Sequence, residues 1–335
     1  MEEGFILNLK EEILKLKKEL DVTVVAHFYQ KDEVFELADI TGDSLELAKK
    51  VMNTNTKFVV FCGVGFMGES VKIMSPQKRV LMPRVACCAM ARMIDESYFL
   101  ENLKIINDAG IKTEDILPIT YINSSARVKA RVGELGGMVC TSSNAYKIIE
   151  KGLQSGKKIF FVPDRCLGQN FANALGLKSA VIGDGKDLKD VDIICYNGFC
   201  SVHQQFSPED IDFYREKYPD ILVAVHPECD PAVCQKADFI GSTSQLITYI
   251  KNLDENQKVV VGTEFNMVSR LRDKNTYILS STKPECPTMN ETTLQHLYNT
   301  LKSIKDDNIS KETEIFVDED TVKWAKVALE RMFEV

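Results

Sequence analysis

Apolar residues in this chain gather in short runs that alternate with stretches of helical periodicity. Each run has the length of a buried strand, and most runs end in Gly, Ser, Thr, Pro or His. This alternation is typical of α/β domains with parallel sheets, because a helix returns the chain from each strand to the start of the next. We therefore predict strands within eleven runs: TVVAHF (23–28), KFVVFCG (57–63), RVLMP (79–83), ILPITY (116–121), GGMVCT (136–141), KIFFVP (158–163), VDIICY (191–196), ILVAVH (221–226), ADFIGS (237–242), KVVVGT (258–263) and TYILSS (276–281).

An internal repeat groups these runs into three units. In each unit a strand end is followed by a turn rich in Ser and Thr, by a helical stretch and finally by a cysteine. The strand ends are His27, Tyr121 and His226, the turns are Thr41–Ser44, Thr141–Ser143 and Ser242–Ser244, and the cysteines are Cys88, Cys200 and Cys286. From strand end to cysteine the intervals are 61, 79 and 60 residues, so the middle unit follows the same plan with insertions, which we place at GELGG (133–137) and GDGKDLKD (183–190). The alternative is that an α/β chain of this length produces such spacings by chance.

The length of 335 residues exceeds that of one ordinary domain. We predict three similar three-layer α/β/α domains with parallel sheets. Their predicted bounds are 1–88 together with 287–335, then 89–200, then 201–286. The first of these opens with an amphipathic helix, whose apolar positions are Ile6, Leu7, Ile13, Leu14 and Leu16.

Composition narrows the functional classes. The net charge is −8 and no long run of Lys and Arg occurs. Binding to nucleic acid is therefore disfavoured, because neutralising phosphates requires clustered positive charge. The N-terminus lacks the long apolar segment of a secretory signal, and the longest apolar run, near residues 58–67, is too short to span a membrane. We expect a cytoplasmic protein without nucleic-acid or membrane partners.

The ten cysteines form no CxxC pair, which disfavours zinc ribbons and ferredoxin-type clusters. Without an export signal a disulfide framework is also disfavoured, and most of these thiols are expected to be small buried hydrophobic groups. If the three units pack about a pseudo-threefold axis, the cysteines that close them meet at one point. Three thiolates on a cubane cluster leave one iron open as a Lewis acid. The ligands predicted in this way are Cys88, Cys200 and Cys286.

Polar side chains at the strand ends are the next candidates. In open α/β sheets ligands bind beyond the carboxyl ends of the strands, where a histidine can contact a ligand or carry a proton. The alternative is that each histidine only caps its strand through backbone hydrogen bonds. The candidates are His27, Tyr29, Tyr121, Asn123, His226 and the neighbouring carboxylate Glu228. His203, three residues past Cys200, is expected near any cluster, and His296 is expected at the surface or in packing.

The three Ser/Thr turns precede stretches that resemble helices opened by Ser or Asn. Helix N-termini bind carboxylates and phosphates through backbone N–H groups, so an acidic protein can bind anions there. Taken singly, each turn is more often only a capped helix.

Nine segments resemble motifs of the quinolinate synthase family. They occur in the order of that family over nearly the whole chain, and the long middle interval between cysteines resembles its longer-chain branch. The segments are AHFYQ (26–30), TGDSLELA (41–48), TYINSSARVKA (120–130), CTSSNA (140–145), NGFCSVH (197–203), HPECDP (226–231), ADFIGSTS (237–244), GTE (262–264) and CPTMN (286–290).

The resemblance implies three α/β domains arranged with pseudo-threefold symmetry around one 4Fe–4S cluster, with three cysteine ligands and one open iron. It implies condensation of iminoaspartate with dihydroxyacetone phosphate to quinolinate, with loss of phosphate and two waters, in NAD biosynthesis. An association with the enzyme that supplies iminoaspartate is a further expectation. The implied cluster ligands are Cys88, Cys200 and Cys286; the implied substrate contacts are His27, Ser44, Tyr121, Asn123, Ser142, His226, Glu228 and Thr243; and the implied catalytic groups are Tyr29, Glu228, His226 and Tyr121.

The chain departs from the family pattern at several positions. Cys87 precedes Cys88 and is its rival as the first ligand, and Arg92 replaces an acidic residue. Gly65 stands where the family commonly has His, and Gly68 where it has Ala. A diverged iron–sulfur hydro-lyase acting on a small hydroxy acid is the alternative enzyme, and an iron–sulfur electron carrier or sensor is the alternative that is not an enzyme.

Overall fold

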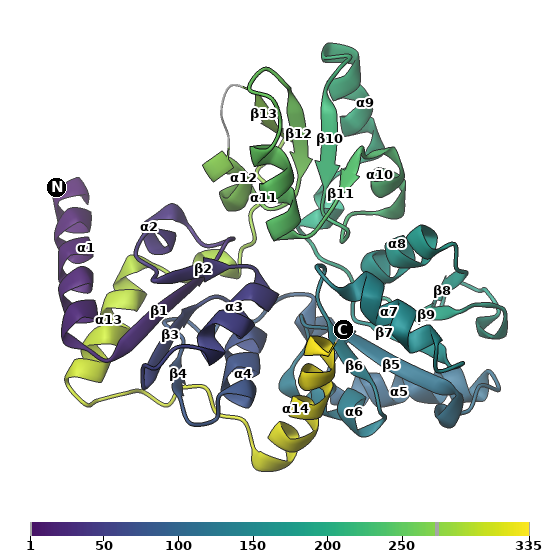
Figure 1. Ribbon diagram of the computed structural model, residues 1–335, viewed down its shortest axis with the longest axis horizontal. Helices are drawn as coiled ribbons and strands as arrows, with labels where there is room; N and C mark the ends of the chain where they lie inside the picture. Colours follow the sequence, from purple (N-terminus) through teal and green to yellow (C-terminus); the bar gives the residue numbers. More distant parts are fainter. Residues whose placement is uncertain (1, 272–274, 335) are drawn as a thin grey trace. The chain divides into compact units, whose positions relative to one another are not determined.

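The computed structural model describes residues 2–271 and 275–334, and its strands form three parallel sheets (Figure 1). The first has the order β2 (Ile40–Gly42), β1 (Val22–His27), β3 (Phe58–Cys62) and β4 (Arg79–Leu81). The second has the order β6 (Met138–Cys140), β5 (Ile116–Tyr121), β7 (Lys158–Val162), β9 (Ile193–Cys195) and β8 (Ser179–Val181). The third has the order β11 (Phe239–Ile240), β10 (Leu222–Val225), β12 (Val259–Gly262) and β13 (Thr276–Ile278). The predicted fold class, three similar α/β units with parallel sheets, is confirmed.

Each of the eleven predicted runs contains a strand. Sequence reasoning missed β2 and β8, which are edge strands of three residues. The central strands β1, β3, β5 and β7 are buried along almost their whole length, as parallel strands covered on both faces require.

The chain divides into two compact units. One combines Met1–Cys88 with Glu285–Glu319, and contains the first sheet. Its helices are α1 (Glu2–Glu19), α2 (Asp32–Phe35), α3 (Ser44–Met52), α4 (Gly65–Met74), the short 3-10 helix η5 (Met289–Glu291) and α13 (Leu294–Lys305).

The other unit combines Ala89–Pro284 with Asp320–Val335 and contains the second and third sheets. Its α-helices are α5 (Glu96–Asp108), α6 (Ala126–Glu134), α7 (Ala145–Leu153), α8 (Arg165–Leu175), α9 (Pro208–Lys217), α10 (Pro231–Lys236), α11 (Thr243–Lys251), α12 (Phe265–Leu271) and α14 (Glu319–Phe333). Its 3-10 helices are η1 (Ala91–Met93), η2 (Thr113–Asp115), η3 (Leu188–Asp190) and η4 (His203–Gln205).

The C-terminal helix α14 packs against the second sheet's layer of helices. A Cβ atom at Gly133 in α6 would lie 2.1 Å from the Trp324 carbonyl oxygen, and Arg331 donates a 2.9 Å hydrogen bond to the Gly137 carbonyl. This helix therefore belongs with the second compact unit. The three predicted domains with their bounds stay a prediction.

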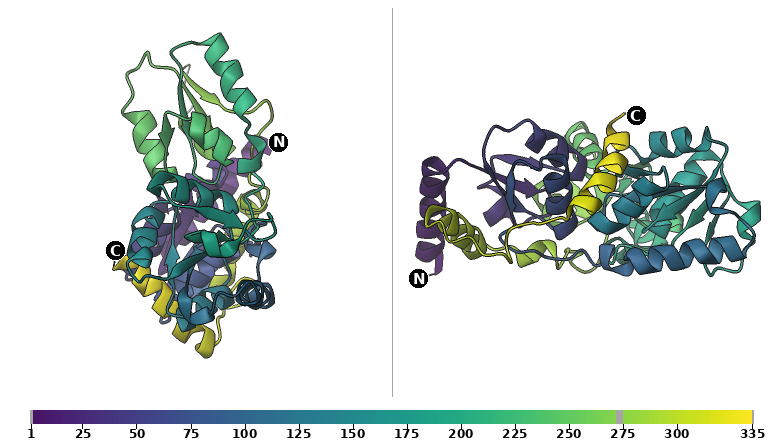
Figure 2. Two further views of the ribbon diagram at one scale, coloured as in Figure 1. Left: turned by 90° about the vertical axis from the view of Figure 1, so that its right-hand side faces the viewer. Right: turned by 90° about the horizontal axis from the view of Figure 1, so that it is seen from below.

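The N-terminal helix α1 was predicted correctly as a helix, and it runs beside α13 (Figures 1 and 2). Its buried seam consists of Leu9, Ile13 and Leu16, which pack in the core of the first sheet. Leu7 and Leu14 are exposed, so the apolar positions inferred from the sequence include residues on the exposed face of the helix as well as on its buried face.

Two connections of the middle unit are longer than their equivalents in the other two sheets. The connection from β5 to β6 contains the nine-residue α6, whereas α2 and α10 in the equivalent connections have four and six residues. The segment 183–190 lies between the extra strand β8 and β9. Both insertions lengthen connections and leave the order of the four shared strands unchanged.

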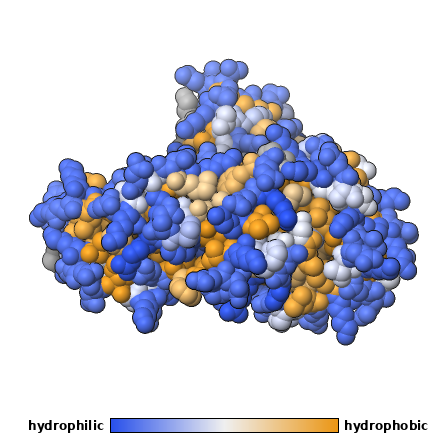
Figure 3. All heavy atoms as spheres, turned by 60° about the horizontal axis from the view of Figure 1, so that its bottom comes forward, coloured by the Kyte–Doolittle hydropathy of each residue, from blue (hydrophilic) through white to orange (hydrophobic). Residues whose placement is uncertain are grey.

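Hydrophilic side chains predominate on the face drawn in Figure 3, with apolar patches between them. Among the described residues no helix combines the length and the apolar character that crossing a membrane requires.

Candidate functional site

The strand ends of the three sheets are structurally equivalent. On the central strand pairs, Ala26 lies opposite Cys62, Thr120 opposite Val162, and Val225 opposite Gly262. The middle strands β3, β7 and β12 then lead into α4, α8 and α12, which begin three residues after these partners. The residues that directly follow Ala26, Thr120 and Val225 are therefore equivalent in the three sheets. The residues two positions after those are equivalent as well. These positions hold His27, Tyr121 and His226, and then Tyr29, Asn123 and Glu228. We call residues 27–30, 121–124 and 226–229 the strand-end loops.

The three Ser/Thr turns are equivalent by the same register. Across the neighbouring edge strands, Ala26 lies opposite Thr41 and Thr120 opposite Val139, and β11 continues this alignment to Ile240 beside Val225. Three residues after each of these edge-strand partners a helical turn begins. In these turns backbone N–H groups donate hydrogen bonds of 2.8–2.9 Å to the carbonyls of Asp43, Thr141 and Ser242. The first residues of these turns are Ser44, Ser142 and Thr243.

Three cysteines also occupy equivalent positions. The first N–H of α4 donates to the Ala86 carbonyl at 2.8 Å, that of α8 to Gly198 at 2.9 Å and that of α12 to Pro284 at 3.0 Å. Two residues after each acceptor stands a cysteine, and three residues after the cysteine a 3-10 helix begins. Seven residues after the cysteine comes the N-cap of the next helix, Asp95, Ser207 or Thr293. The cysteines in this register are Cys88, Cys200 and Cys286, whereas Cys87 is one residue out of register. We call residues 86–93, 198–205 and 284–291 the cysteine loops.

Exposure divides the ten cysteines into two groups. Six are buried, and burial raises the pKa of Cys62, Cys166 and Cys234 to about 12 and also raises the pKa of Cys140, Cys195 and Cys229. A thiol with a raised pKa is a poor nucleophile and a poor metal ligand, because the thiolate is the reactive form. The cysteines that are at least partly exposed are Cys87, Cys88, Cys200 and Cys286.

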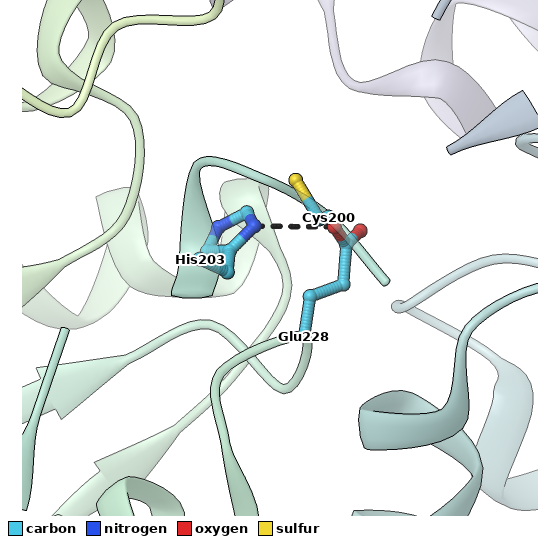
Figure 4. A group of neighbouring side chains, drawn as sticks. All are labelled: Cys200, His203 and Glu228. Atoms are coloured by element: carbon cyan, nitrogen blue, oxygen red, sulfur yellow. Dashed lines mark ion pairs between the residues drawn. The ribbon is translucent and has the colours of Figure 1, made fainter. Parts of the chain in front are cut away.

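A polar cluster joins the strand-end loops of the second and third sheets. The Tyr121 hydroxyl donates a 2.6 Å hydrogen bond to Glu228 Oε1, and His203 Nδ1 lies 3.1 Å from Glu228 Oε2. His203 Nε2 lies 3.1 Å from the Thr263 hydroxyl, and its ring stacks on His226 with 4.6 Å between centroids. All of these side chains are buried. Figure 4 shows the His203 ring and the Glu228 carboxylate facing each other beside Cys200.

Electrostatics fix the ionisation of Glu228. Burial opposes the charged form, but the His203 and His226 imidazoles and the Tyr121 hydroxyl outweigh burial and lower the pKa of Glu228 to about 2. A carboxylate held in this way can accept a proton from a substrate only while its contacts rearrange, and the Tyr121 hydroxyl is hydrogen-bonded to it.

A second buried carboxyl lies near Glu228. Asp164 is fully buried at the start of α8, where its Oδ1 accepts a 3.0 Å hydrogen bond from the Leu167 N–H. Its Oδ2 has no hydrogen-bond partner among the described residues. Burial and the nearby charge of Glu228 raise the pKa of Asp164 well above its usual range. The two carboxyls therefore differ, because the pKa of Glu228 is lowered and that of Asp164 is raised.

In the first sheet the strand-end loop carries His27 and Tyr29. Their rings meet edge to face with 4.7 Å between centroids, and the Tyr29 N–H donates to His27 Nδ1 at 3.1 Å. His27 is buried and Tyr29 is half-buried.

All twelve residues predicted for the site are buried or half-buried. The structure brings Tyr121, His226, Glu228 and Cys200 together in one unit, and His27 with Tyr29 in the other. Ser142 lines a cavity of about 350 Å³ whose walls carry no charged side chain, together with Ser143, Tyr146, Asn170, Phe171, Asn173, Ala174, Pro227, Cys234, Gln235, Ile240, Gly241 and Gln245.

Sequence reasoning missed the roles of Thr263 and Asp164 and placed His203 only near a cluster. Thr263 is the last residue of one predicted strand run and Asp164 directly follows another, so the rule that ligand-facing groups lie at strand ends could have found them. Their partners could not be found, because they lie 60 or more residues away in the chain.

Two departures from the family pattern differ in their local space. A Cβ atom at Gly68 would lie 2.6 Å from Met82 Sδ, so Met82 occupies the room that an alanine needs. A Cβ atom at Gly65 would meet nothing closer than 3.5 Å, so an alanine has room there. Arg92 is exposed in η1, and nothing in the structure explains its charge.

Parallel sheets whose strand-end loops carry His, Tyr and Glu, with cysteines in the loops beyond them, define an α/β enzyme that binds small molecules beyond the carboxyl ends of its strands. The profile of the quinolinate synthetase A protein family matches residues 11–334. The chain belongs to the quinolinate synthetase A family.

Curated relatives agree with this assignment. The chain is 53% identical to the quinolinate synthase of Helicobacter pylori (strain HPAG1), over 98% of both chains. It is 39% identical to that of Acidobacterium capsulatum, over 98% of this chain and 93% of the relative. It is 38% identical to that of Streptomyces coelicolor, over 93% of this chain and 84% of the relative.

The donor set is compatible with a metal cofactor. Cys200, His203 and Glu228 offer ligand atoms within 4.8 Å of one another. His203 and Glu228 are buried and already contact Thr263 and Tyr121, whereas Cys200 is the partly exposed donor of this group. The residues present therefore fit a thiolate-bound metal group.

Proposed function

We propose that this chain is a quinolinate synthase, which condenses iminoaspartate with dihydroxyacetone phosphate to quinolinate with loss of phosphate and two waters. The observation that carries the proposal is the register of the three sheets. Four kinds of position repeat three times, and every one of the twelve holds a side chain suited to bind an anion, move a proton or ligate iron. A fold alone does not require this.

We propose that Cys88, Cys200 and Cys286 together bind one 4Fe–4S cluster. Their equivalent loops and their partial exposure support this ligand set over the six buried cysteines. A cluster with three cysteine ligands leaves one iron open, which supplies Lewis-acid chemistry to a substrate oxygen. Cys87 remains the rival for the first ligand, and the register favours Cys88.

The chain's own residues bind the anionic groups and move protons. The turns that begin at Ser44, Ser142 and Thr243 offer hydroxyls and helical N–H groups to carboxylates and phosphate. His27, Asn123 and His226 are further contacts for the substrates. These assignments extend to the chain the roles that family resemblance implies.

Proton transfer is assigned to the phenols and the carboxylate. Glu228 as a buried carboxylate accepts a proton from substrate carbon, and the Tyr121 hydroxyl, already hydrogen-bonded to it, returns one to oxygen. Tyr29, which follows a strand of the first sheet, also transfers protons. The His226 ring stacks on His203 and so restricts the movement of the Glu228 side chain. Isomerisation, dehydration and ring closure each need such a transfer.

The direct test supplies both substrates to the anaerobically purified and reconstituted chain. Pyridine-2,3-dicarboxylate and inorganic phosphate are expected in equal amounts. Absence of the dicarboxylate would contradict the proposal, and dehydration of a hydroxy acid without phosphate release would favour an iron–sulfur hydro-lyase instead. A cytoplasmic location and an association with the enzyme that supplies iminoaspartate also stay predictions, and co-purification of the two proteins from cell extract tests the second.

A further inference from the structure

A buried glutamine connects two loops of the first compact unit that are far apart in the chain. Gln30 Nε2 donates a 2.9 Å hydrogen bond to the Met289 carbonyl and lies 3.5 Å from Met289 Sδ. Gln30 is fully buried, and its own N–H donates to the His27 carbonyl at 3.0 Å. One side chain thus links the strand-end loop 27–30 to the cysteine loop 284–291.

The same kind of contact occurs in the other unit. Met289 stands three residues after Cys286, and His203 stands three residues after Cys200. His203 contacts the strand-end loop of the third sheet through Glu228 at 3.1 Å and through stacking on His226. In both units, therefore, the first residue of the 3-10 helix after the cysteine is held by a strand-end loop.

The residue at the Gln30 position differs among the three strand-end loops. Its equivalents are Ser124 and Cys229, which are also buried. Ser124 Oγ donates to the Tyr121 carbonyl at 3.0 Å, and Cys229 Sγ lies 3.5 Å from the Gly262 carbonyl, so both short side chains bond within their own sheet. The longer glutamine is the one that reaches a cysteine loop.

We propose that Gln30 is a positioning residue that holds the Cys286 loop against the strand-end loop carrying His27 and Tyr29. This inference rests on the proposed function, since it concerns how a cysteine ligand is held relative to a proton-transfer group. Gln30 itself touches neither substrate nor iron in this assignment. It acts by keeping two loops in one arrangement, which lowers the reorganisation that the reaction requires.

The test compares hydrogen exchange of the peptide 285–292 in the full-length chain and in Gln30→Met. The substitution keeps the length and volume of the side chain and removes the amide donor. The Asn290 N–H, which donates to the Cys286 carbonyl at 3.1 Å, reports on the loop. Because a buried carbonyl then loses its partner, exchange in this peptide is expected to be about tenfold faster. In reconstituted enzyme kcat is expected to fall about tenfold with little change in KM.

Two control variants separate local positioning from general loss of stability. Met289→Leu keeps the backbone carbonyl and should exchange at the wild-type rate. Lys78→Met removes a buried side chain that contacts the carbonyls of Thr54 and Thr56 elsewhere in the same unit, and should leave the peptide 285–292 unchanged.

Equal exchange in wild type and Gln30→Met would overturn the proposal, and so would faster exchange in Lys78→Met of the same size. Faster exchange with an unchanged kcat would also overturn the positioning role. The exchange measurement needs neither cluster nor substrates, so a wild type that forms no quinolinate would refute the proposed function and leave this result readable.

Discussion

The Tyr121 hydroxyl donates a 2.6 Å hydrogen bond to Glu228 Oε1, although the two residues are 107 positions apart in the chain. The other carboxylate oxygen faces His203 at 3.1 Å. Glu228 is therefore held on both sides inside a buried cluster, which fixes its orientation before any substrate arrives. In the proposed reaction Glu228 accepts a proton close to the Tyr121 hydroxyl.

Replacing Glu228 by glutamine should remove this proton acceptor and keep the shape of the cluster. We expect kcat to fall by about 10²–10⁴-fold in Glu228→Gln, which is the usual contribution of general acid–base catalysis, with a smaller fall in Tyr121→Phe. Steady-state kinetics with varied dihydroxyacetone phosphate measure this, and thermal unfolding checks that the fold is intact. A Glu228→Gln enzyme with the wild-type kcat would remove Glu228 from the proton transfers.

The register of the cysteine loops predicts which thiols bind iron. After anaerobic reconstitution with iron and sulfide, Cys88→Ala, Cys200→Ala and Cys286→Ala should each retain less iron than wild type, whereas Cys87→Ala should retain it. Iron and sulfide contents and the visible absorption of the cluster measure this. If Cys87→Ala loses the cluster and Cys88→Ala keeps it, the first ligand moves by one residue.

Removal of the metal should abolish activity. A cluster with an open iron is expected to lose that iron during prolonged handling in air with a chelator, and activity should fall in parallel. Anaerobic addition of ferrous iron should restore it. Full activity after such treatment would contradict the Lewis-acid role.

Much of the fold follows from local pattern. Runs such as KFVVFCG and KVVVGT are strands because their side chains are apolar on both faces, as a parallel sheet covered on both sides requires. The edge strand β2 was missed because Ile40 is its one apolar residue. The contact of α14 with Gly133 and Gly137 is a tertiary contact, and no sequence pattern within residues 319–333 predicts it.

The sequence predicted which residues lie in the candidate site, but it did not predict which of their side chains contact one another. His27, Tyr121 and His226 could be selected because they end strands, and the register shows that they are equivalent. That Tyr121 meets Glu228, or Gln30 meets Met289, could not be inferred, because each pairing depends on how loops from different sheets or distant segments pack.

Gly198 should be required for the Cys200 loop. A Cβ atom there would lie 2.4 Å from the Pro163 carbonyl oxygen, while the Gly198 N–H donates to that same carbonyl at 3.1 Å. We expect Gly198→Ala to lower the free energy of unfolding by roughly 1–3 kcal/mol, because the backbone must shift to make room. Denaturant unfolding measures this. Gly65→Ala, whose Cβ atom would meet nothing within 3.5 Å, is the control, and an equal loss in both variants would contradict the steric explanation.

Asp164 should make the stability of the protein depend on pH in a definite direction. Burial and the charge of Glu228 raise the pKa of Asp164 in the folded chain above its unfolded value of about 3.9. The folded state therefore holds a proton that the unfolded chain releases. The stability that this proton supplies is complete below the unfolded pKa and is lost as pH rises through the folded pKa.

Asp164→Asn does not titrate, and asparagine can still accept the Leu167 N–H as a helix cap. The melting temperature of the variant should therefore exceed that of wild type by an amount that grows from pH 4 upward. The corresponding difference in the free energy of unfolding is about 1.4 kcal/mol for each unit by which the pKa is raised. Thermal unfolding between pH 4 and pH 9 measures the difference. Asp187→Asn, at the exposed cap of η3, should follow the wild-type profile. Parallel profiles for wild type and Asp164→Asn would show that folding does not raise the pKa of Asp164, and the opposite pKa shifts assigned to Asp164 and Glu228 would then be wrong.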